Sequence, residues 1–271
     1  MGIGKGTGML FDRYIGIDYS GRGEPDERTS GIQVVELDQE GNVRRIAPGG
    51  GPARTFSWSR REVYEYLSAL LAAASNQRLA IGIDHNLSFP ISYFTQRGLK
   101  DWEAFLGHFQ ALWNTKEQSV KVCREKAPSY PNSTELRLTE AYTSSAKSAW
   151  NFEQLTGAVS YSTHAGIPWI YELRAASRDR LHVWPYDGWS PQAGKSVLAE
   201  VYPAILYQRF KRLGDFPQDW PRDAQDAFVI AAWLRERDLN GTLVRYFQVD
   251  TLTEQEKQMA LQYEGWILGV C

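Results

Sequence analysis

Apolar residues come in short runs over the first fifty residues of the chain, and glycine-rich or polar turns separate these runs. Runs of this length, rich in β-branched and aromatic residues, are typical of β-strands. Three of them lie at residues 14–19, 31–37 and 43–47. Gly41 stands between the second and third runs, which favours a hairpin turn there. The pattern predicts three consecutive strands.

A helix and a fourth strand follow. Ser59 and Glu62 have the spacing of a capping box, in which the serine accepts from a backbone N–H and the glutamate reaches back. Apolar residues then recur at helical spacing from Val63 to Leu71, so one face of this helix is expected to pack on a sheet. The continuously apolar run 79–83 is typical of a strand covered on both faces.

Helical patterns dominate the middle of the chain, between residues 91 and 180. We interpret this stretch as a mainly helical insertion, with helices expected at 102–113 and 115–126. Short strands return at residues 181–184 and 197–202. The whole chain, residues 1–271, is therefore expected to form one α/β domain with a mixed sheet flanked by helices.

The last fifty residues begin with a clear helix signal. Pro221 stands at a helix start, and Asn240-Gly241 ends the helix that runs to about Asp238. Residues 243–249 are predicted to form a last strand, because β-branched and aromatic residues are frequent there. A second capping box, from Thr253 to Glu256, starts a final helix.

Composition and charge limit the classes of protein to consider. Hydrophobic residues make up 43% and charged residues 23%, which is ordinary for a globular enzyme. The formal net charge of −2 excludes a global basic field, so a nucleic-acid partner would need a local basic groove. The two cysteines, Cys123 and Cys271, are not in a zinc-binding pattern. Without a long apolar run or a signal-peptide core, we expect a cytoplasmic protein that does not contact a membrane.

Acidic residues occur where strands and helices end or begin. Asp18 closes the first strand, Asp84 closes the fourth, and Glu200 lies in a later strand. Asp223 and Asp226 are three apart on a helix and share a face. Gathered together, these five carboxylates would repel one another unless a divalent cation were bound. All-oxygen sites of this kind suit Mg²⁺ or Mn²⁺, and two such ions roughly 4 Å apart can support phosphodiester hydrolysis.

Each acid also has an ordinary structural explanation. Asp84-His85 could be a plain turn after a strand, and Asp223 could be a favourable charge at a helix N-terminus. What favours a single shared site is the order of these acids along the chain. They fall on a predicted sequence of three strands, a helix, a strand and a later helix.

In that order the acids resemble the acidic signature of the RNase H-like superfamily, and the Asp-x-x-Asp-Ala helix start is similar to that of RuvC-type resolvases. More closely, the chain resembles an uncharacterised bacterial family described as predicted RNase H-like nucleases. The segments that carry this resemblance are Ile15–Asp18, Ile83–Pro90, Arg137–Glu140, Val183–Pro185, Glu200–Pro203 and Asp223–Ala227. His85-Asn86 departs from the family pattern, which has a small residue and proline there.

The resemblance implies an RNase H-like fold and a metal site. Its main metal ligands would be Asp18, Asp84 and Asp226, with Glu200 and Asp223 completing or orienting the shell. We expect a Mg²⁺- or Mn²⁺-dependent hydrolase, a nuclease that acts on DNA or RNA.

Three further residues are candidates for contact with substrate. Arg137 and Glu140 are three apart, which favours a surface ion pair, with a substrate clamp over the carboxylates as the alternative. His85 could move protons beside Asp84, although a single histidine in a loop is more often polar surface.

Basic residues form two clusters that could follow a phosphate backbone, although solvated helix faces explain such clusters more often. These residues are Arg54, Arg60 and Arg61, and Lys116, Lys121, Arg124 and Lys126.

Two alternative functions remain open. The first is a non-catalytic binding or adaptor protein on the same fold. The second is an ATP-dependent phosphotransferase of the actin or sugar-kinase type, because Asp18-Tyr-Ser-Gly21 is similar to a phosphate-binding turn of that group. Such proteins duplicate their fold, and the first strand motif has no second copy here.

Overall fold

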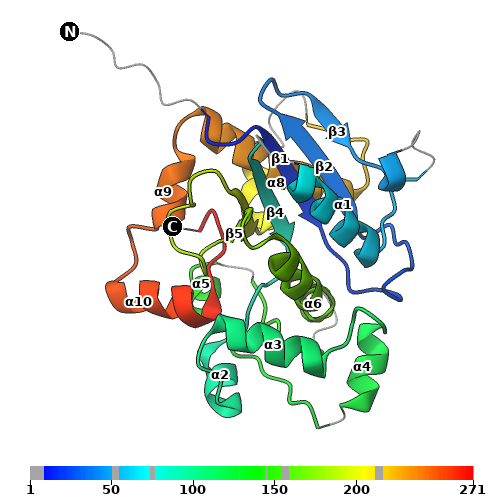
Figure 1. Ribbon diagram of the computed structural model, residues 1–271, viewed down its shortest axis with the longest axis vertical. Coiled ribbons are helices and arrows are strands. Elements are labelled where there is room, and N and C mark those ends of the chain that lie inside the picture. The colour runs from blue at the N-terminus through cyan, green and yellow to red at the C-terminus, as the bar shows by residue number, and fades with distance from the viewer. Residues whose placement is uncertain are drawn as a thin grey trace.

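A mixed sheet lies at the centre of the computed structural model, which describes residues 9–50, 55–73, 77–127, 129–143, 146–153, 159–210 and 216–270 (Figure 1). Its strands are β1 (Arg13–Asp18), β2 (Gln33–Asp38), β3 (Val43–Arg45), β4 (Leu79–Asp84), β5 (Leu181–Val183) and β6 (Ser196–Glu200). The six strands lie in the order β3-β2-β1-β4-β6-β5. The pairs β3–β2 and β2–β1 are antiparallel, whereas the pairs β1–β4, β4–β6 and β6–β5 are parallel. The carboxyl ends of β1, β4 and β6 therefore meet at one edge.

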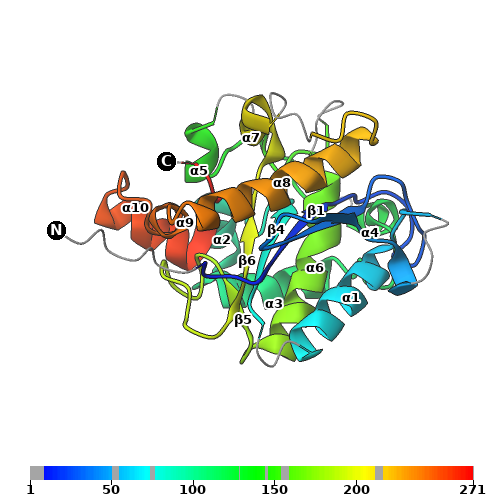
Figure 2. The same cartoon turned by 90° about the horizontal axis from the view of Figure 1, so that it is seen from above.

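Helices cover both faces of this sheet. They are α1 (Arg60–Ala73), α2 (Ile91–Arg97), α3 (Trp102–Leu112), α4 (Val120–Lys126), α5 (Leu138–Ala141), α6 (Ser160–Ser177), α7 (Pro203–Phe210), α8 (Arg222–Leu239), α9 (Leu243–Gln248) and α10 (Glu254–Met259), with short helical turns at Pro48–Gly50 and Ala260–Glu264. Seen from above, α8 lies on one face and α1 and α6 on the other (Figure 2). Two separate apolar cores fill these layers.

Two glycines allow α8 to approach the sheet closely. A Cβ on Gly16 of β1 would lie 1.9 Å from the carbonyl oxygen of Ala227, and one on Gly82 of β4 would lie 2.3 Å from Ile230. Side chains alternate between the faces of a strand, so the residues two positions later share this face with the glycines. Those residues are Asp18 and Asp84. The first turns of α8 therefore lie against the aspartates that end β1 and β4.

The predicted helix starts at both capping boxes are confirmed. Ser59 Oγ accepts from the Glu62 N–H (3.2 Å), and the Glu62 carboxylate accepts from the Ser59 N–H (3.0 Å). Thr253 and Glu256 make the same reciprocal pair before α10. The predicted insertion, residues 91–180, contains α2 to α6, and α6 packs beside α1 on the sheet.

The predicted strand at 243–249 is wrong, because this segment forms α9. Leu243 and Phe247 are four residues apart and both are buried, whereas Val244 between them is exposed. That spacing buries one side of a helix, and the local preference of aromatic and branched residues for strands does not outweigh it. No helix among the described residues is long and apolar enough to cross a membrane.

Candidate functional site

Asp18 and Asp84 are the closest partners of the site. They are paired in register at the carboxyl ends of the adjacent parallel strands β1 and β4, and a side-chain hydrogen bond joins them. Burial is the largest cause and the negative charges of Asp226 and Glu200 follow; against the effect of the bond to Asp18, they raise the pKa of Asp84 to about 8. The pair therefore holds a proton at a higher pH than an ordinary aspartate does.

The pKa of Asp18 is raised well above its usual range. Burial is the largest cause, followed by the charges of Asp84, Asp223 and Asp226, while the N–H of Tyr19 acts in the opposite direction. The structure thus brings together four aspartates that are up to 208 positions apart in the sequence. A group of like charges at one sheet edge favours the binding of protons or cations.

The two helical aspartates come from the first turns of α8. Burial raises the pKa of both Asp223 and Asp226. Arg222 Nε donates to Asp226 Oδ2 (3.2 Å). The other oxygen, Asp226 Oδ1, is buried and has no hydrogen-bond partner among the described residues. A buried carboxylate oxygen without a partner is costly, so a proton or a cation is expected to bind it.

Glu200 is oriented differently from the aspartates. Its register partner in β4 is Ile83, so its side chain leaves the opposite face of the sheet from Asp84. Arg137 donates to both of its carboxylate oxygens, from Nη1 to Oε2 (2.8 Å) and from Nη2 to Oε1 (2.6 Å). The N–H of Leu87 adds a third bond (3.1 Å). Burial raises the pKa of Glu200, and Arg137 opposes this effect.

The ion pair predicted for Arg137 and Glu140 is present, but its predicted place on the surface is wrong, because both side chains are buried, at 1% and 2% exposure. Arg137 Nε donates to Glu140 Oε1 (3.0 Å), and the same oxygen accepts from Asn86 Nδ2 (2.6 Å). The pKa of Arg137 is raised: burial lowers it, but the charges of Glu200 and Glu140 raise it by more. A buried arginine between two glutamates links α5 to the carboxyl end of β6.

His85 is not on the surface, where a single histidine in a loop was expected. It is 2% exposed, its Nδ1 lies 2.9 Å from the Asn86 carbonyl oxygen, and its ring contacts that of Tyr19 at 4.8 Å between centroids. Gly166 of α6 leaves room for the ring. Burial lowers the pKa of His85 to about 4. His85 therefore faces the α1 and α6 layer rather than the carboxylates.

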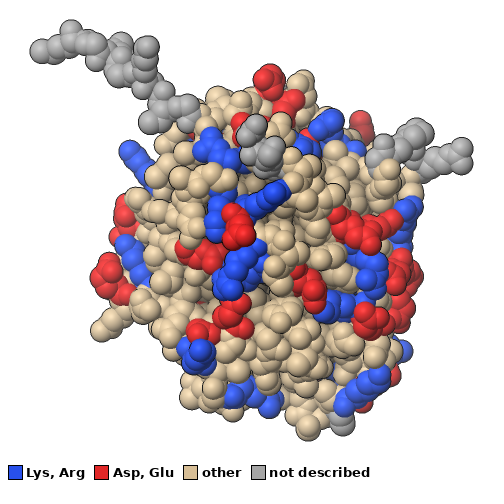
Figure 3. All heavy atoms as spheres, viewed as in Figure 1, with Lys and Arg blue, Asp and Glu red and all other residues tan. Residues whose placement is uncertain are grey.

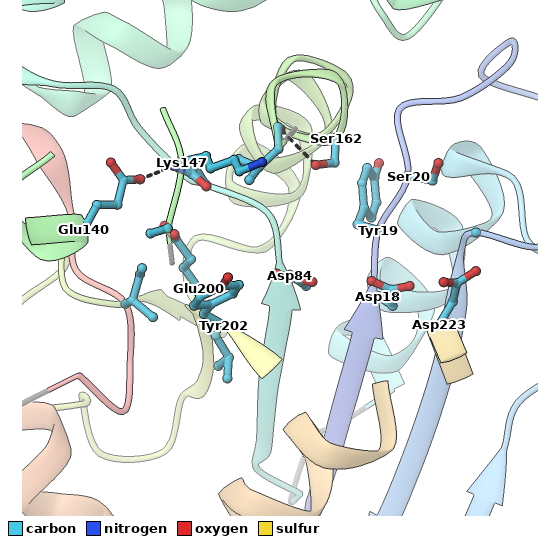
Figure 4. A pocket seen from close by; sticks show the side chains of 16 residues that line it. Asp18, Tyr19, Ser20, Asp84, Glu140, Lys147, Ser162, Glu200, Tyr202 and Asp223 are labelled. Carbon is cyan, nitrogen blue, oxygen red and sulfur yellow. Dashed lines mark hydrogen bonds between the residues drawn. The ribbon is translucent and has the colours of Figure 1, made fainter. Parts of the chain in front are cut away.

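A cavity of about 450 Å³ opens above this edge of the sheet (Figure 4). It is lined by Asp18, Tyr19, Ser20, Gly31, Asp84, Asn86, Glu140, Ala146, Lys147, Val159, Ser162, Glu200, Val201, Tyr202, Asp223 and Ile267. Figure 4 shows Asp84 between Glu200 and Asp18, with Asp223 beyond Asp18. Arg137, His85 and Asp226 do not line this cavity, although Asp226 acts on Asp18 and Asp84 through its charge.

Several of these lining residues were not among the predicted site residues. Tyr19, Ser20 and Asn86 lie one or two positions after the strand-end aspartates, and this position is the sequence signal that could have predicted them. Lys147 and Ser162 come from the predicted insertion, where no local pattern marks them.

The donor set suits a hard divalent cation, because it consists of carboxylate oxygens and includes the unpartnered Asp226 Oδ1. In the arrangement seen here, however, the described residues contain no group of three or more His, Cys, Asp or Glu side chains placed to hold a metal ion. Four of the five carboxylates have another partner: Asp84 pairs with Asp18, Asp226 with Arg222 and Glu200 with Arg137. Binding of a metal ion would therefore require these side chains to rearrange.

Comparison with protein-family models, with curated proteins and with solved structures finds no match to this chain.

Proposed function

We propose that the chain is an RNase H-like, divalent-metal-dependent nuclease. The observation that carries the proposal is the in-register pair Asp18 and Asp84, with Asp223 and Asp226 of α8 close enough to raise the pKa of Asp18. Like charges held this close are costly to the fold, and a function at the site explains why the cost is tolerated.

The order of elements also supports the RNase H-like assignment. Three antiparallel strands, a helix, a parallel strand and a later acidic helix follow one another in β1–β3, α1, β4 and α8. Asp18, Asp84 and Asp226 are the proposed main ligands of Mg²⁺ or Mn²⁺. When bound, the cation supplies positive charge that neutralises the aspartates and polarises the phosphodiester.

The residues of the chain have separate tasks in this proposal. Asp18, Asp84 and Asp226, the last through its unpartnered oxygen, would hold the cation, and Asp223 lines the pocket beside them. Glu200 has a positioning role, because Arg137 and the Leu87 N–H hold it. Through these bonds it fixes the loop that follows Asp84.

Thermal unfolding with and without Mg²⁺ or Mn²⁺ tests the proposal. A cation that binds only the folded state well above half saturation adds about 1 kcal/mol or more to the free energy of unfolding. We expect this gain in the wild type and in Asp250→Asn, a matched change at an exposed aspartate outside the pocket. We expect it to disappear in Asp18→Asn.

Cleavage assays on labelled single- and double-stranded DNA and RNA complete the test. Asp18→Asn should abolish metal-dependent cleavage while its circular dichroism spectrum stays that of the wild type. Equal cleavage by the wild type and Asp18→Asn would exclude this site as the nuclease centre.

A second candidate, a non-catalytic binding protein, is favoured by one specific observation. Both oxygens of Glu200 are used by a buried arginine, and no preformed metal-ligand group is present among the described residues. Failure of both ions to stabilise the wild type would support this candidate. The structure adds nothing in favour of the phosphotransferase alternative, whose fold is duplicated, since the described residues form a single sheet.

A further inference from the structure

A second cavity adjoins the carboxylate pocket. Its volume is about 400 Å³, and it shares Tyr19, Ser20 and Ser162 with the first cavity. Its remaining lining residues are Gly21, Arg22, Gly23, Ser119, Lys121 and Tyr161. The two cavities meet at these three shared residues; aspartates and glutamates line the first, and Arg22 and Lys121 line the second. We call the second cavity the basic pocket.

The two basic side chains of the basic pocket, Arg22 and Lys121, make no ion pair among the described residues, and the nearest carboxylate at its wall is that of Glu27, beside Gly23. Among the described residues, the neighbouring Arg28, Arg61 and Lys116 are paired with Glu62, Asp26 and Glu172. Arg22 and Lys121 are exposed, and no ion pair within the described part of the chain includes either. On the face seen in Figure 3, basic and acidic side chains are interspersed. A local basic pocket beside an acidic one fits a ligand with several phosphates, one of them held by cations at the aspartates.

An aromatic ring stands at the basic pocket. Tyr161, at the start of α6, is 38% exposed, and its ring meets that of Phe152 edge-on at 5.2 Å between centroids. The Phe152 contact restricts the ring while leaving part of its surface to solvent. Exposed aromatic rings beside a basic groove are the surfaces on which unpaired bases stack.

The loop of residues 21–23, which lies between the end of β1 and Tyr161 in the wall of the basic pocket, is held in place by two sets of contacts. Arg60 is buried and donates to the carbonyl oxygens of Arg22 (2.8 Å) and Gly23 (2.9 Å). A Cβ on Gly21 would lie 2.0 Å from the Tyr161 carbonyl oxygen, so this loop packs directly on the N-terminal turn of α6. The buried arginine thus holds the position of Arg22 in advance of binding, which reduces the entropy lost on binding.

We propose that the basic pocket binds the backbone phosphate and base of a nucleotide next to the scissile linkage, and that the substrate is single-stranded nucleic acid. A base must leave its helix to stack on Tyr161, which excludes a fully paired strand at this position. The cavity volume is that of a small-ligand site, sufficient for one nucleotide. This inference rests on the proposed nuclease function, because that function places the scissile linkage of the bound nucleic acid at the carboxylates.

Fluorescence anisotropy with labelled short oligothymidylate and oligouridylate tests the basic pocket directly. Measured at low salt with EDTA, binding requires no cleavage. We expect Arg22→Gln/Lys121→Gln to raise the Kd about tenfold or more, since two phosphate contacts are lost. We expect Tyr161→Ala to raise it about fivefold or more, since one stacked base is lost.

The matched control is Lys100→Gln/Arg178→Gln, which removes the same charge from exposed positions that line neither cavity. Arg178 lies at the opposite end of α6 from Tyr161. The control should change the Kd less than twofold. The proposal is overturned if both oligonucleotides fail to bind the wild type, if a duplex of equal length binds more tightly, or if the pocket variants behave like the control.

These outcomes differ from those that test the nuclease. If the oligonucleotides bind in the basic pocket but neither cation stabilises the fold, the single-strand site stands and the hydrolytic function fails. If the cations stabilise the fold but the pocket variants bind like the control, the metal site stands and the single-strand site fails.

Discussion

The carbonyl oxygen of Ala227 in α8 lies so close to Gly16 in β1 that a Cβ on the glycine would be 1.9 Å from it. This contact fixes the distance between the helix and the strand. Because Asp18 follows Gly16 on the same face, and Asp223 precedes Ala227 by about one helical turn, the contact also fixes how close the acids come.

Gly16→Ala should therefore affect both stability and the site. The backbone of α8 must move away, and overpacking of this kind costs about 2–3 kcal/mol in the free energy of unfolding. Urea denaturation measures the loss, and the stabilisation by Mg²⁺ or Mn²⁺ should fall with it. The control is Gly107→Ala in α3, where a Cβ meets no atom within 4 Å. That change should raise stability by about 0.5–1 kcal/mol, as alanine does in helices. Equal effects of the two substitutions would contradict the close contact.

Asp84→Asn should stabilise the protein at neutral pH when divalent ions are removed. The amide can donate to Asp18 without the proton uptake on folding that a carboxyl with a raised pKa requires at neutral pH. We expect a gain of about 1 kcal/mol or more in the free energy of unfolding, because one unit of raised pKa costs about 1.4 kcal/mol above that pKa. Chemical denaturation in EDTA measures it. A variant less stable than the wild type under these conditions would show that the aspartate pair does not lower the free energy of unfolding.

Arg137→Met should be strongly destabilising, because it leaves Glu200 and Glu140 buried without a cation. Removing one partner of a buried ion pair costs about 3–5 kcal/mol. The double variant Arg137→Met/Glu200→Gln should recover part of that loss, which a double-mutant cycle measures. Glu200→Gln alone should keep the stabilisation by Mg²⁺ if Glu200 only positions the loop after Asp84. Loss of that stabilisation would instead make Glu200 a metal ligand.

His164 should make the protein sensitive to acid. It is buried among aromatic rings, its Nδ1 lies 2.7 Å from the Ser160 carbonyl oxygen, and burial lowers its pKa from 6.5 to about 3. A lowered histidine pKa means that the unfolded chain binds the proton first, so stability falls as the pH drops below 6.5 and continues to fall towards 3. At pH 5 the loss from this group is about 2 kcal/mol.

The measurement is the free energy of unfolding at pH 7.5 and pH 5. In His164→Gln the difference between the two values should be smaller than in the wild type by about the contribution of His164. An unchanged difference would mean that His164 does not govern the acid response. Lys100→Gln, an exposed change, serves as the control and should keep the wild-type pH dependence.

Much of the sheet and the positions of the main acids followed from the sequence alone. Alternation and apolar runs defined β1, β2 and β4, and both capping boxes marked real helix starts. Asp18 and Asp84 were found because an acid directly after an apolar strand is a local signal. Asp223 and Asp226 were predicted to share one face of a helix, now α8, because they are three residues apart. Both signals are local, since each depends only on neighbours within a few residues.

The orientation of Glu200 and the burial of Arg137 were decided only by the tertiary structure. Which face Glu200 leaves depends on the register of β6 against β4, and that register follows from packing between distant segments. Arg137 and Glu140 looked like a surface pair because their spacing is compatible with an exposed helix, and their burial arises from contacts with β6 and the turn at Glu264. The segment 243–248 forms the helix α9 because, on a helix, Leu243 and Phe247 both pack into an apolar core to which other elements contribute most residues. Local sequence specifies what each segment can form, whereas burial against remote residues selects among those possibilities, because the free energy of packing exceeds the small differences in intrinsic propensity.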